Sequence, residues 1–279
     1  MNRTLEVIAG SDLVERPRRS RWPARLDYLQ SASGLVLALF MWAHMGFVSS
    51  ILFGKNALWV VARTFEGYYF FGRSYPVIVS IAVAVIFALV IGHAALALRK
   101  FPINYRQFRT FRGHMAMMRH SDTSLWFTQV VTGFALFFLA SVHLYIMMTN
   151  PGKIGPFMSS YRVWSQHLWP LYLLLLLAVE FHGGIGLYRL SVKWNWFGGA
   201  NPDGVRHNLK VLKWAITVFF LAIGFATLAT FIKIATTTHL SYGERYVPTW
   251  QQNALPGQGG QAAPVAGQPA TTSQAGGAQ

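Results

Sequence analysis

The 279-residue sequence contains no cysteine. This absence excludes disulfides, thiolate metal sites, iron–sulfur ligands and the CxxCH motif of a c-type heme, so any redox centre must be held by His or Met. Acidic residues are also few, with nine Asp and Glu against 24 Lys and Arg and a formal charge of +15. Only 12% of the chain is charged while 53% is hydrophobic, which favours a membrane protein over a soluble enzyme.

Five apolar segments are each about 20 residues long, the length that an α-helix needs to cross a bilayer core. Tryptophan and proline gather near their ends, as expected at membrane interfaces and helix boundaries. The segments are Leu29–Leu52, Val77–Leu98, Leu125–Met148, Leu168–Leu190 and Trp214–Ile234. We therefore expect an all-α membrane protein with a five-transmembrane-helix bundle over residues 28–240.

Both ends of the chain differ from this bundle in composition. Residues 1–27 are polar and basic and lack the apolar core of a cleavable signal, so we expect a cytoplasmic N-terminal segment. Residues 241–279 are expected to form an outer tail. Its positions 251–279 carry no charge and consist almost entirely of Gln, Gly, Ala, Pro, Thr and Ser, which predicts disorder.

The basic residues alternate between the two sides of the predicted bundle. Of the 24 Lys and Arg, 17 lie in the N-terminal segment and in the segments that follow the second and fourth spans. The positive-inside rule then places the N-terminus in the cytoplasm and the C-terminus outside. The charge is thus assigned to membrane-flanking loops rather than to a nucleic-acid partner, and the cytoplasmic loop Arg99–Arg119 is the expected docking surface for a soluble protein.

Four of the nine histidines lie within the predicted spans. His44 and His143 lie 15 and 18 positions from the cytoplasmic ends of their spans, whereas His93 and His182 lie five and eight positions from theirs. At 1.5 Å per residue the two levels differ by roughly 10–20 Å. Depth therefore pairs His44 with His143 near the outer face and His93 with His182 near the inner face. Each pair predicts a six-coordinate b heme suited to electron transfer.

Two other interpretations of these histidines stay open on the residues alone. Each histidine could be a buried polar group that bonds across helices. Intramembrane histidines also serve proton relays in transporters that contain no heme. Four histidines in two depth-matched pairs favour two hemes over either alternative.

Two carboxylates stand out by position. Glu180 lies within the fourth span, and an intramembrane acid usually marks a proton path. A protonated acid bonded to a neighbouring helix is the alternative. Glu66 precedes the second span within the aromatic stretch Phe65–Phe71, where it could accept protons from a quinol near the outer heme. On position alone, a solvated loop acid is the simpler interpretation of Glu66.

Four further side chains fall at the cytoplasmic level of the predicted bundle. Hydrogen-bond donors and a cation there would suit heme propionates, although Trp and Lys are common at membrane interfaces anyway. These residues are Gln30, Ser31, Trp126 and Lys193.

Several motifs resemble the single-chain, five-helix diheme cytochrome b subunit of quinol:fumarate reductases, in the succinate:quinone oxidoreductase superfamily. The motifs are FMWAH at Phe40–His44, HAALALRKFPINYRQF at His93–Phe108, MRHSDTSLW at Met118–Trp126, SVHLYIMM at Ser141–Met148 and WPLYLLLLLAVEFHGGIGLYRL at Trp169–Leu190. The resemblance covers about residues 18–235 and leaves out the tail from about Ser241.

The resemblance implies a role for each candidate residue. It implies that the inner histidine pair ligates a proximal heme and that the outer pair ligates a distal heme. It implies that Glu66 is needed for menaquinol oxidation and that Glu180 serves a transmembrane proton path. The four side chains at the cytoplasmic level are implied to contact propionates of the proximal heme.

The resemblance also implies partner subunits, because this sequence has no cysteine and no nucleotide-binding pattern. An iron–sulfur subunit and an FAD-containing flavoprotein, on the cytoplasmic side of a bacterial inner membrane, would reduce fumarate with electrons from menaquinol. A dimer of such heterotrimers is implied. The same complex working in reverse would oxidise succinate and reduce menaquinone, and a heme-free proton-coupled transporter is the alternative from another class.

Overall fold

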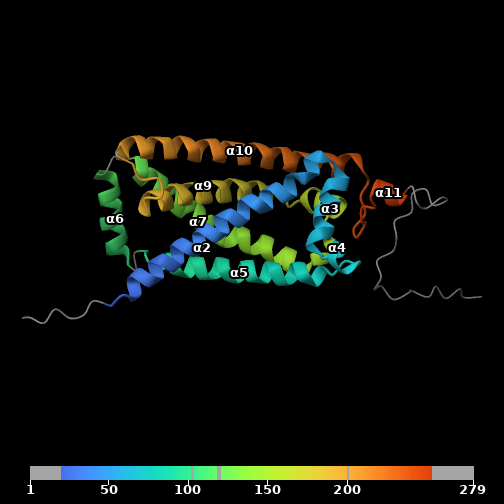
Figure 1. The fold of residues 1–279 in the computed structure, drawn as a ribbon, viewed down its shortest axis with the longest axis horizontal. Coiled ribbons are helices and arrows are strands. Elements are labelled where there is room, and N and C mark those ends of the chain that lie inside the picture. Colours follow the sequence, from blue (N-terminus) through green and yellow to red (C-terminus); the bar gives the residue numbers. More distant parts are fainter. Residues whose placement is uncertain (1–19, 102–103, 118–120, 200, 253–279) are drawn as a thin grey trace, which may run out of the picture.

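The computed structural model describes residues 20–101, 104–117, 121–199 and 201–252, and the regular secondary structure in these ranges is helical (Figure 1). Five long helices in these ranges are apolar enough to cross a membrane, which confirms the predicted all-α bundle. They are α2 (Trp22–Val48, continued by the 3-10 turn Ser49–Phe53), α5 (Pro76–Leu98), α7 (Ser121–Thr149), α9 (Trp169–Lys193) and α10 (Pro202–Thr237).

The long helices extend beyond the apolar segments that the sequence predicts. Helix α10 begins at Pro202, well before the predicted start at Trp214, because the Asn201 side chain caps it by accepting a hydrogen bond from Gly204 N at 3.0 Å. Proline also lies in the first turn of α2, α5 and α9, where its missing N–H costs no hydrogen bond. Hydropathy locates the part of each helix in the bilayer core, whereas caps and prolines set where the helix begins.

Four of the long helices form a ring. Helix α2 packs against α5 and α9, and α7 also packs against α5 and α9. Helix α10 lies outside this ring and packs along α9 (Figure 1). Each ring helix contributes one histidine of the predicted spans, so the interior of the ring is where the four side chains can meet.

The outer surface of the bundle is strongly apolar. Helix α5 has no buried residue in the described structure, and Val77, Ile81 and Val85 are each more than half exposed along one of its faces. An apolar surface of this extent is unfavourable in water and suits lipid acyl chains. The chain is therefore a multi-pass membrane protein.

Short helices lie at the two ends of the bundle (Figure 1). Helix α6 (Tyr105–Met117) crosses one end, called the α6 end below. The opposite end, called the α3 end, holds α3 (Lys55–Phe65), α4 (Tyr68–Phe71), the 3-10 turn Pro151–Lys153, α8 (Pro156–Val163) and α11 (Thr249–Gln252).

The tail predicted from residue 241 begins with a packed segment at the α3 end. Tyr246 is buried, and its hydroxyl donates to Asn56 Oδ1 at 2.6 Å. Asn56 Nδ2 in turn donates to Thr249 Oγ1 at 2.9 Å. Aromatic and hydrogen-bonding side chains fix residues 241–252 in this way. Residues 253–279 and 1–19 lie outside the described residues, so disorder of the tail stays a prediction.

Candidate redox site

His93 of α5 and His182 of α9 face one another across the ring of helices. Their ring centres lie 6.4 Å apart, and the ring planes are nearly perpendicular at 88°. His93 Nδ1 lies 3.0 Å from Ser33 Oγ, and His182 Nδ1 lies 2.9 Å from the backbone oxygen of Gln129. Because both rings use Nδ1 for these hydrogen bonds, Nε2 is the nitrogen left for a metal.

His44 of α2 and His143 of α7 form a second pair, nearer the α3 end. Their ring centres lie 6.2 Å apart with the planes at 59°. His44 stacks on Phe40, and His143 packs edge-on against Tyr172 with ring centres 5.6 Å apart. Nδ1 of His143 is buried without a hydrogen-bond partner among the described residues, which is unusual for a polar atom. The structure thus brings together the two pairs that depth predicts, while their role as ligands stays a prediction.

The spacing of both pairs fits two imidazoles bound to one iron. An imidazole nitrogen binds a metal at about 2 Å and the ring centre lies about 1 Å behind it, so ligands on opposite sides of a metal have ring centres about 6 Å apart. Among the residues that the structure describes, no three His, Asp or Glu side chains gather to hold a metal by themselves. Two axial histidines therefore fit a macrocycle such as heme, which supplies the other ligands.

Two glycines leave space for the imidazole rings of the inner histidine pair. A Cβ on Gly133 would lie 2.9 Å from Cε1 of His182, and a Cβ on Gly34 would lie 2.9 Å from Cε1 of His93. Each ring is thus held between a hydrogen bond at Nδ1 and a bare stretch of helix backbone. The orientation of both imidazoles is therefore set by the protein itself.

Of the four side chains predicted to meet propionates, the structure brings two into contact. Lys193 Nζ donates to Ser31 Oγ at 2.9 Å and also pairs with Asp27, which Lys100 contacts as well. Gln30 lies on the same helix as Ser31, and its buried Oε1 has no hydrogen-bond partner among the described residues. Both lysines already pair with Asp27, and Gln30 Oε1 is an acceptor, so contact of these side chains with heme propionates stays a prediction.

Trp126 is not in that contact group. Its ring packs edge-on against Phe111 of α6, with ring centres 4.8 Å apart. In this structure Trp126 therefore joins α7 to the helix that crosses the α6 end.

Glu180 is fully buried within α9. The Trp42 indole lies close to the carboxyl group, but neither oxygen of Glu180 has a hydrogen bond of normal geometry among the described residues. A buried, unpartnered acid in the middle of a span is costly, and such groups are usually kept for a function.

Glu66 is buried at the α3 end with 1% of its surface exposed, so the interpretation as a solvated loop acid is wrong. The carboxylate pairs with Arg63 at 2.5 Å, and the backbone oxygen of Glu66 accepts from Tyr75 N at 2.8 Å. Gly67, with a φ of 77°, turns the chain directly after Glu66 in a conformation that favours glycine. Burial raises the pKa of Glu66 above its ordinary value, although the Arg63 guanidinium opposes this shift.

Comparison with known proteins adds to this geometry. Residues 104–223 match the family model described as succinate dehydrogenase/fumarate reductase transmembrane subunit. Over 229 residues the chain is 53% identical to the fumarate reductase cytochrome b subunit of Wolinella succinogenes, an alignment that covers 82% of this chain and 89% of the relative. The fumarate reductase cytochrome b subunit of Helicobacter pylori is 54% identical over 210 residues, which cover 75% of this chain and 81% of that protein.

The chain belongs to the family of fumarate reductase cytochrome b subunits. It is therefore a membrane subunit of a quinol:fumarate oxidoreductase, as the sequence motifs predict. The family name also supports heme b as the cofactor that the paired histidines fit.

By sequence, Arg162 of this cytochrome b subunit counts only as outer-side charge, whereas the structure buries it. Arg162 of α8 is 5% exposed, and its Nη2 donates to the backbone oxygen of Lys153 at 2.7 Å. It lies near Tyr172, whose ring packs edge-on against His143. A buried guanidinium beside the outer histidine pair suits an acidic group of a cofactor. No sequence pattern distinguishes it from an ordinary interfacial arginine.

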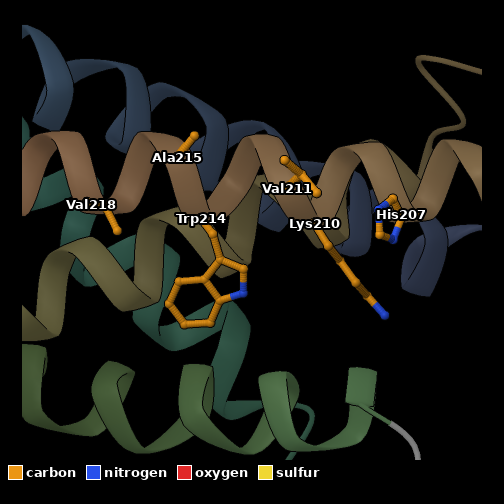
Figure 2. A pocket seen from close by; sticks show the side chains of 6 residues that line it. All are labelled: His207, Lys210, Val211, Trp214, Ala215 and Val218. Carbon is orange, nitrogen blue, oxygen red and sulfur yellow. The ribbon is translucent and has the colours of Figure 1, made fainter.

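A shallow groove on the cytochrome b subunit lies apart from both histidine pairs. Its volume is about 610 Å³, and Figure 2 shows His207 and Lys210 toward the beginning of α10 and apolar side chains further along. None of the paired histidines lines this groove, so it is not the redox site. The lining residues are His207, Lys210, Val211, Trp214, Ala215 and Val218.

Proposed function

We propose that this subunit oxidises menaquinol at the α3 end and passes electrons through two bis-histidine hemes to partner subunits at the α6 end. The observation that supports this most is that two histidine pairs cross one ring of helices with ring centres 6.2 and 6.4 Å apart. Hemes bound between them would supply one-electron carriers at two depths.

The distribution of charge supports the orientation. Arg106, Arg109 and Arg112 are exposed on α6, beside exposed Tyr105 and Phe108. Basic residues gather on the cytoplasmic side of membrane proteins, and aromatic residues and arginine are enriched in protein interfaces. We assign the α6 end to the cytoplasm, as the docking surface for an iron–sulfur subunit and its flavoprotein, and the α3 end to the outer face.

Glu66 is the proposed base in quinol oxidation. Menaquinol loses two electrons and two protons, and an ionised Glu66 can accept a proton from a quinol hydroxyl. The Arg63 guanidinium stabilises the ionised carboxylate. Tyr69, Phe70 and Phe71 of the adjacent α4 are all more than half exposed, and their rings form an apolar surface for a quinone ring.

Glu180 is the proposed intermediate of a proton path between the two faces. Its burial in the middle of α9 without a charged partner among the described residues supports this role. Each proton that Glu180 carries would accompany electron transfer, so that the membrane is not charged by the reaction.

The proposal covers fumarate reduction, and the same residues would serve the reverse reaction. Protonation at Glu66 is reversible, and the matching family model spans succinate dehydrogenases as well as fumarate reductases. The rates of menaquinol:fumarate and succinate:menaquinone turnover, measured on the purified complex, decide which direction this enzyme favours.

An optical and kinetic experiment tests the proposal. The purified complex should show dithionite-reducible b heme at two hemes per chain, and Glu66→Gln should retain both hemes while losing quinol oxidation. Absence of heme would overturn the redox role and favour the proton-coupled transporter. Unchanged quinol oxidation in the heme-loaded Glu66→Gln complex would overturn the assignment of the quinol site.

A further inference from the structure

Three arginines, from α3, from α8 and from the segment that follows α10, converge on one short turn at the α3 end. Three consecutive backbone oxygens of this turn each accept a hydrogen bond from a different guanidinium. Arg245 Nη2 donates to Gly152 O at 2.7 Å, Arg162 Nη2 to Lys153 O at 2.7 Å and Arg63 Nη2 to Ile154 O at 3.3 Å. The turn at residues 152–154 is therefore a common anchor for all three cations.

Two of these arginines belong to the sites already described. Arg63 pairs with Glu66 and also donates to Ser74 Oγ at 3.2 Å. Arg162 lies near Tyr172, which packs against His143 of the outer histidine pair. A shift of the turn would therefore move both the partner of the proposed base and the buried cation near His143.

Arg245 is the third arginine, and neither the mechanism nor the resemblance assigns it a role. The segment that carries it is fixed on both sides. Tyr242 contacts Lys153 and packs against Tyr161 of α8, while Tyr246 bonds to Asn56 of α3. Arg245 thus reaches the turn from a segment that is itself held on the α3 end.

We propose that Arg245 is a positioning residue for quinol oxidation, which holds the turn at residues 152–154 so that Arg63 and Arg162 keep their places. This inference rests on the proposed function of Glu66. Arg245 acts in two ways: its hydrogen bond to Gly152 O fixes the turn, and its charge lies near the pair of Arg63 and Glu66.

The charge of Arg245 has a defined direction of effect. The groups that face Glu66 are Arg63 on its own helix, Ser74 in the following loop and Arg245 from the C-terminal segment. Both guanidinium groups lower the pKa of Glu66, against the larger effect of burial, which raises it. Without Arg245, Glu66 should be protonated at a higher pH and should act as a base only above that pH.

Gly152 offers a way to displace Arg245 without removing its charge. A Cβ on Gly152 would lie 2.9 Å from Arg245 Nη2, while its next neighbour, Pro76 Cγ, is at an ordinary 3.7 Å. Gly152→Ala should therefore push the guanidinium off the turn and leave the rest of the packing intact.

The experiment uses the heme-loaded complex, with a short-chain naphthoquinol as donor and fumarate as acceptor. Arg245→Met and Gly152→Ala should lower kcat by up to about a hundredfold, the loss that a misplacement of about 1 Å can cause. Arg245→Met should also move the acid limb of the pH profile to higher pH, whereas Arg245→Lys should leave the limb in place. Arg73→Met, which removes an exposed arginine at the same end, should match wild type.

The heme spectrum and Glu66→Gln separate the possible failures. If Arg245→Met and Gly152→Ala behave like Arg73→Met while Glu66→Gln is inactive, Arg245 has no positioning role and the quinol site stands. If Glu66→Gln is as active as wild type, the proposed function itself fails. If Arg245→Met loses heme or fails to assemble, Gly152→Ala decides: wild-type kcat in that variant overturns the proposal.

Discussion

Gly133 of α7 faces the ring edge of His182 so closely that a single added carbon would lie 2.9 Å from Cε1 and 3.1 Å from Nδ1. The backbone oxygen of Gln129, one helical turn away, accepts from the same imidazole. One turn of α7 thus fixes both the hydrogen bond and the clearance of His182.

Gly133→Ala should therefore lower the occupancy of the inner heme and leave the outer heme in place. The new methyl group forces the ring of His182 to shift within a packed interior, at a cost of about 1–3 kcal/mol. Heme per chain, with a redox titration that resolves the two hemes, measures the effect. Gly113→Ala on α6 is the matched control, because its Cβ would meet nothing within 4 Å. Full inner-heme content in Gly133→Ala would contradict the prediction.

Ser33→Ala should raise the midpoint potential of the inner heme. Removing the 3.0 Å contact to His93 Nδ1 makes the imidazole a poorer electron donor, so the oxidised iron is less stabilised. A loss of heme affinity of about 10- to 100-fold is expected as well. Redox titration of the purified complex measures the shift. Ser50→Ala serves as the control, since the Ser50 hydroxyl donates to the backbone oxygen of Phe47 on its own helical stretch. Equal potentials in both variants would refute the role of Ser33.

Arg63→Met should move the acid limb of quinol oxidation to higher pH. Burial already raises the pKa of Glu66, and Arg63 is the largest of the groups that lower it. Without that charge the carboxyl group stays protonated over a wider pH range, and only the ionised form accepts a proton. The measurement is kcat/KM for quinol against pH. Arg63→Lys, which keeps the charge, should return the limb toward that of wild type, and an unmoved limb in Arg63→Met would argue against Glu66 as the base.

Asp27→Asn should have only a small effect on stability despite removing two ion pairs. Asp27 pairs with Lys100 and Lys193, and all three side chains are about a third to a half exposed. Exposed pairs contribute about 0–1 kcal/mol each and weaken with salt. Thermal unfolding of the detergent-solubilised complex at low and high salt checks this, with Asp203→Asn as the exposed control. A loss that persists at high salt would show that Asp27 does more than pair with the two lysines.

The spans and the histidine pairs could be predicted from the sequence because each depends on local properties. Hydropathy over about 20 residues located the spans. Counting residues from the span ends placed His44 with His143 and His93 with His182, and the same pairs are in contact. Helix rise is constant, so linear position translates directly into depth.

The contacts of the candidate residues could not be predicted from the sequence, because they depend on tertiary packing. Whether Glu66 is solvated depends on the turn at Gly67 and on what covers α3, which residue order alone does not state. Trp126 has the right depth for a propionate partner, yet its ring contacts Phe111. Asp27 lies four residues before Ser31 on one helix, and this spacing was a usable signal for the acid that Lys193 contacts.

The bare surface of α5 has a consequence for how the subunit is assembled. Helix α5 has no buried residue in the described structure, whereas seven residues of α9 are buried. Once the helices are inserted, α7, α9 and α10 have the contacts to associate by themselves. If His93 helps to bind the inner heme as proposed, we expect α5 to join them last and heme binding to complete the tertiary structure. In cells short of heme, we expect α5 to be the first segment that quality-control proteases recognise.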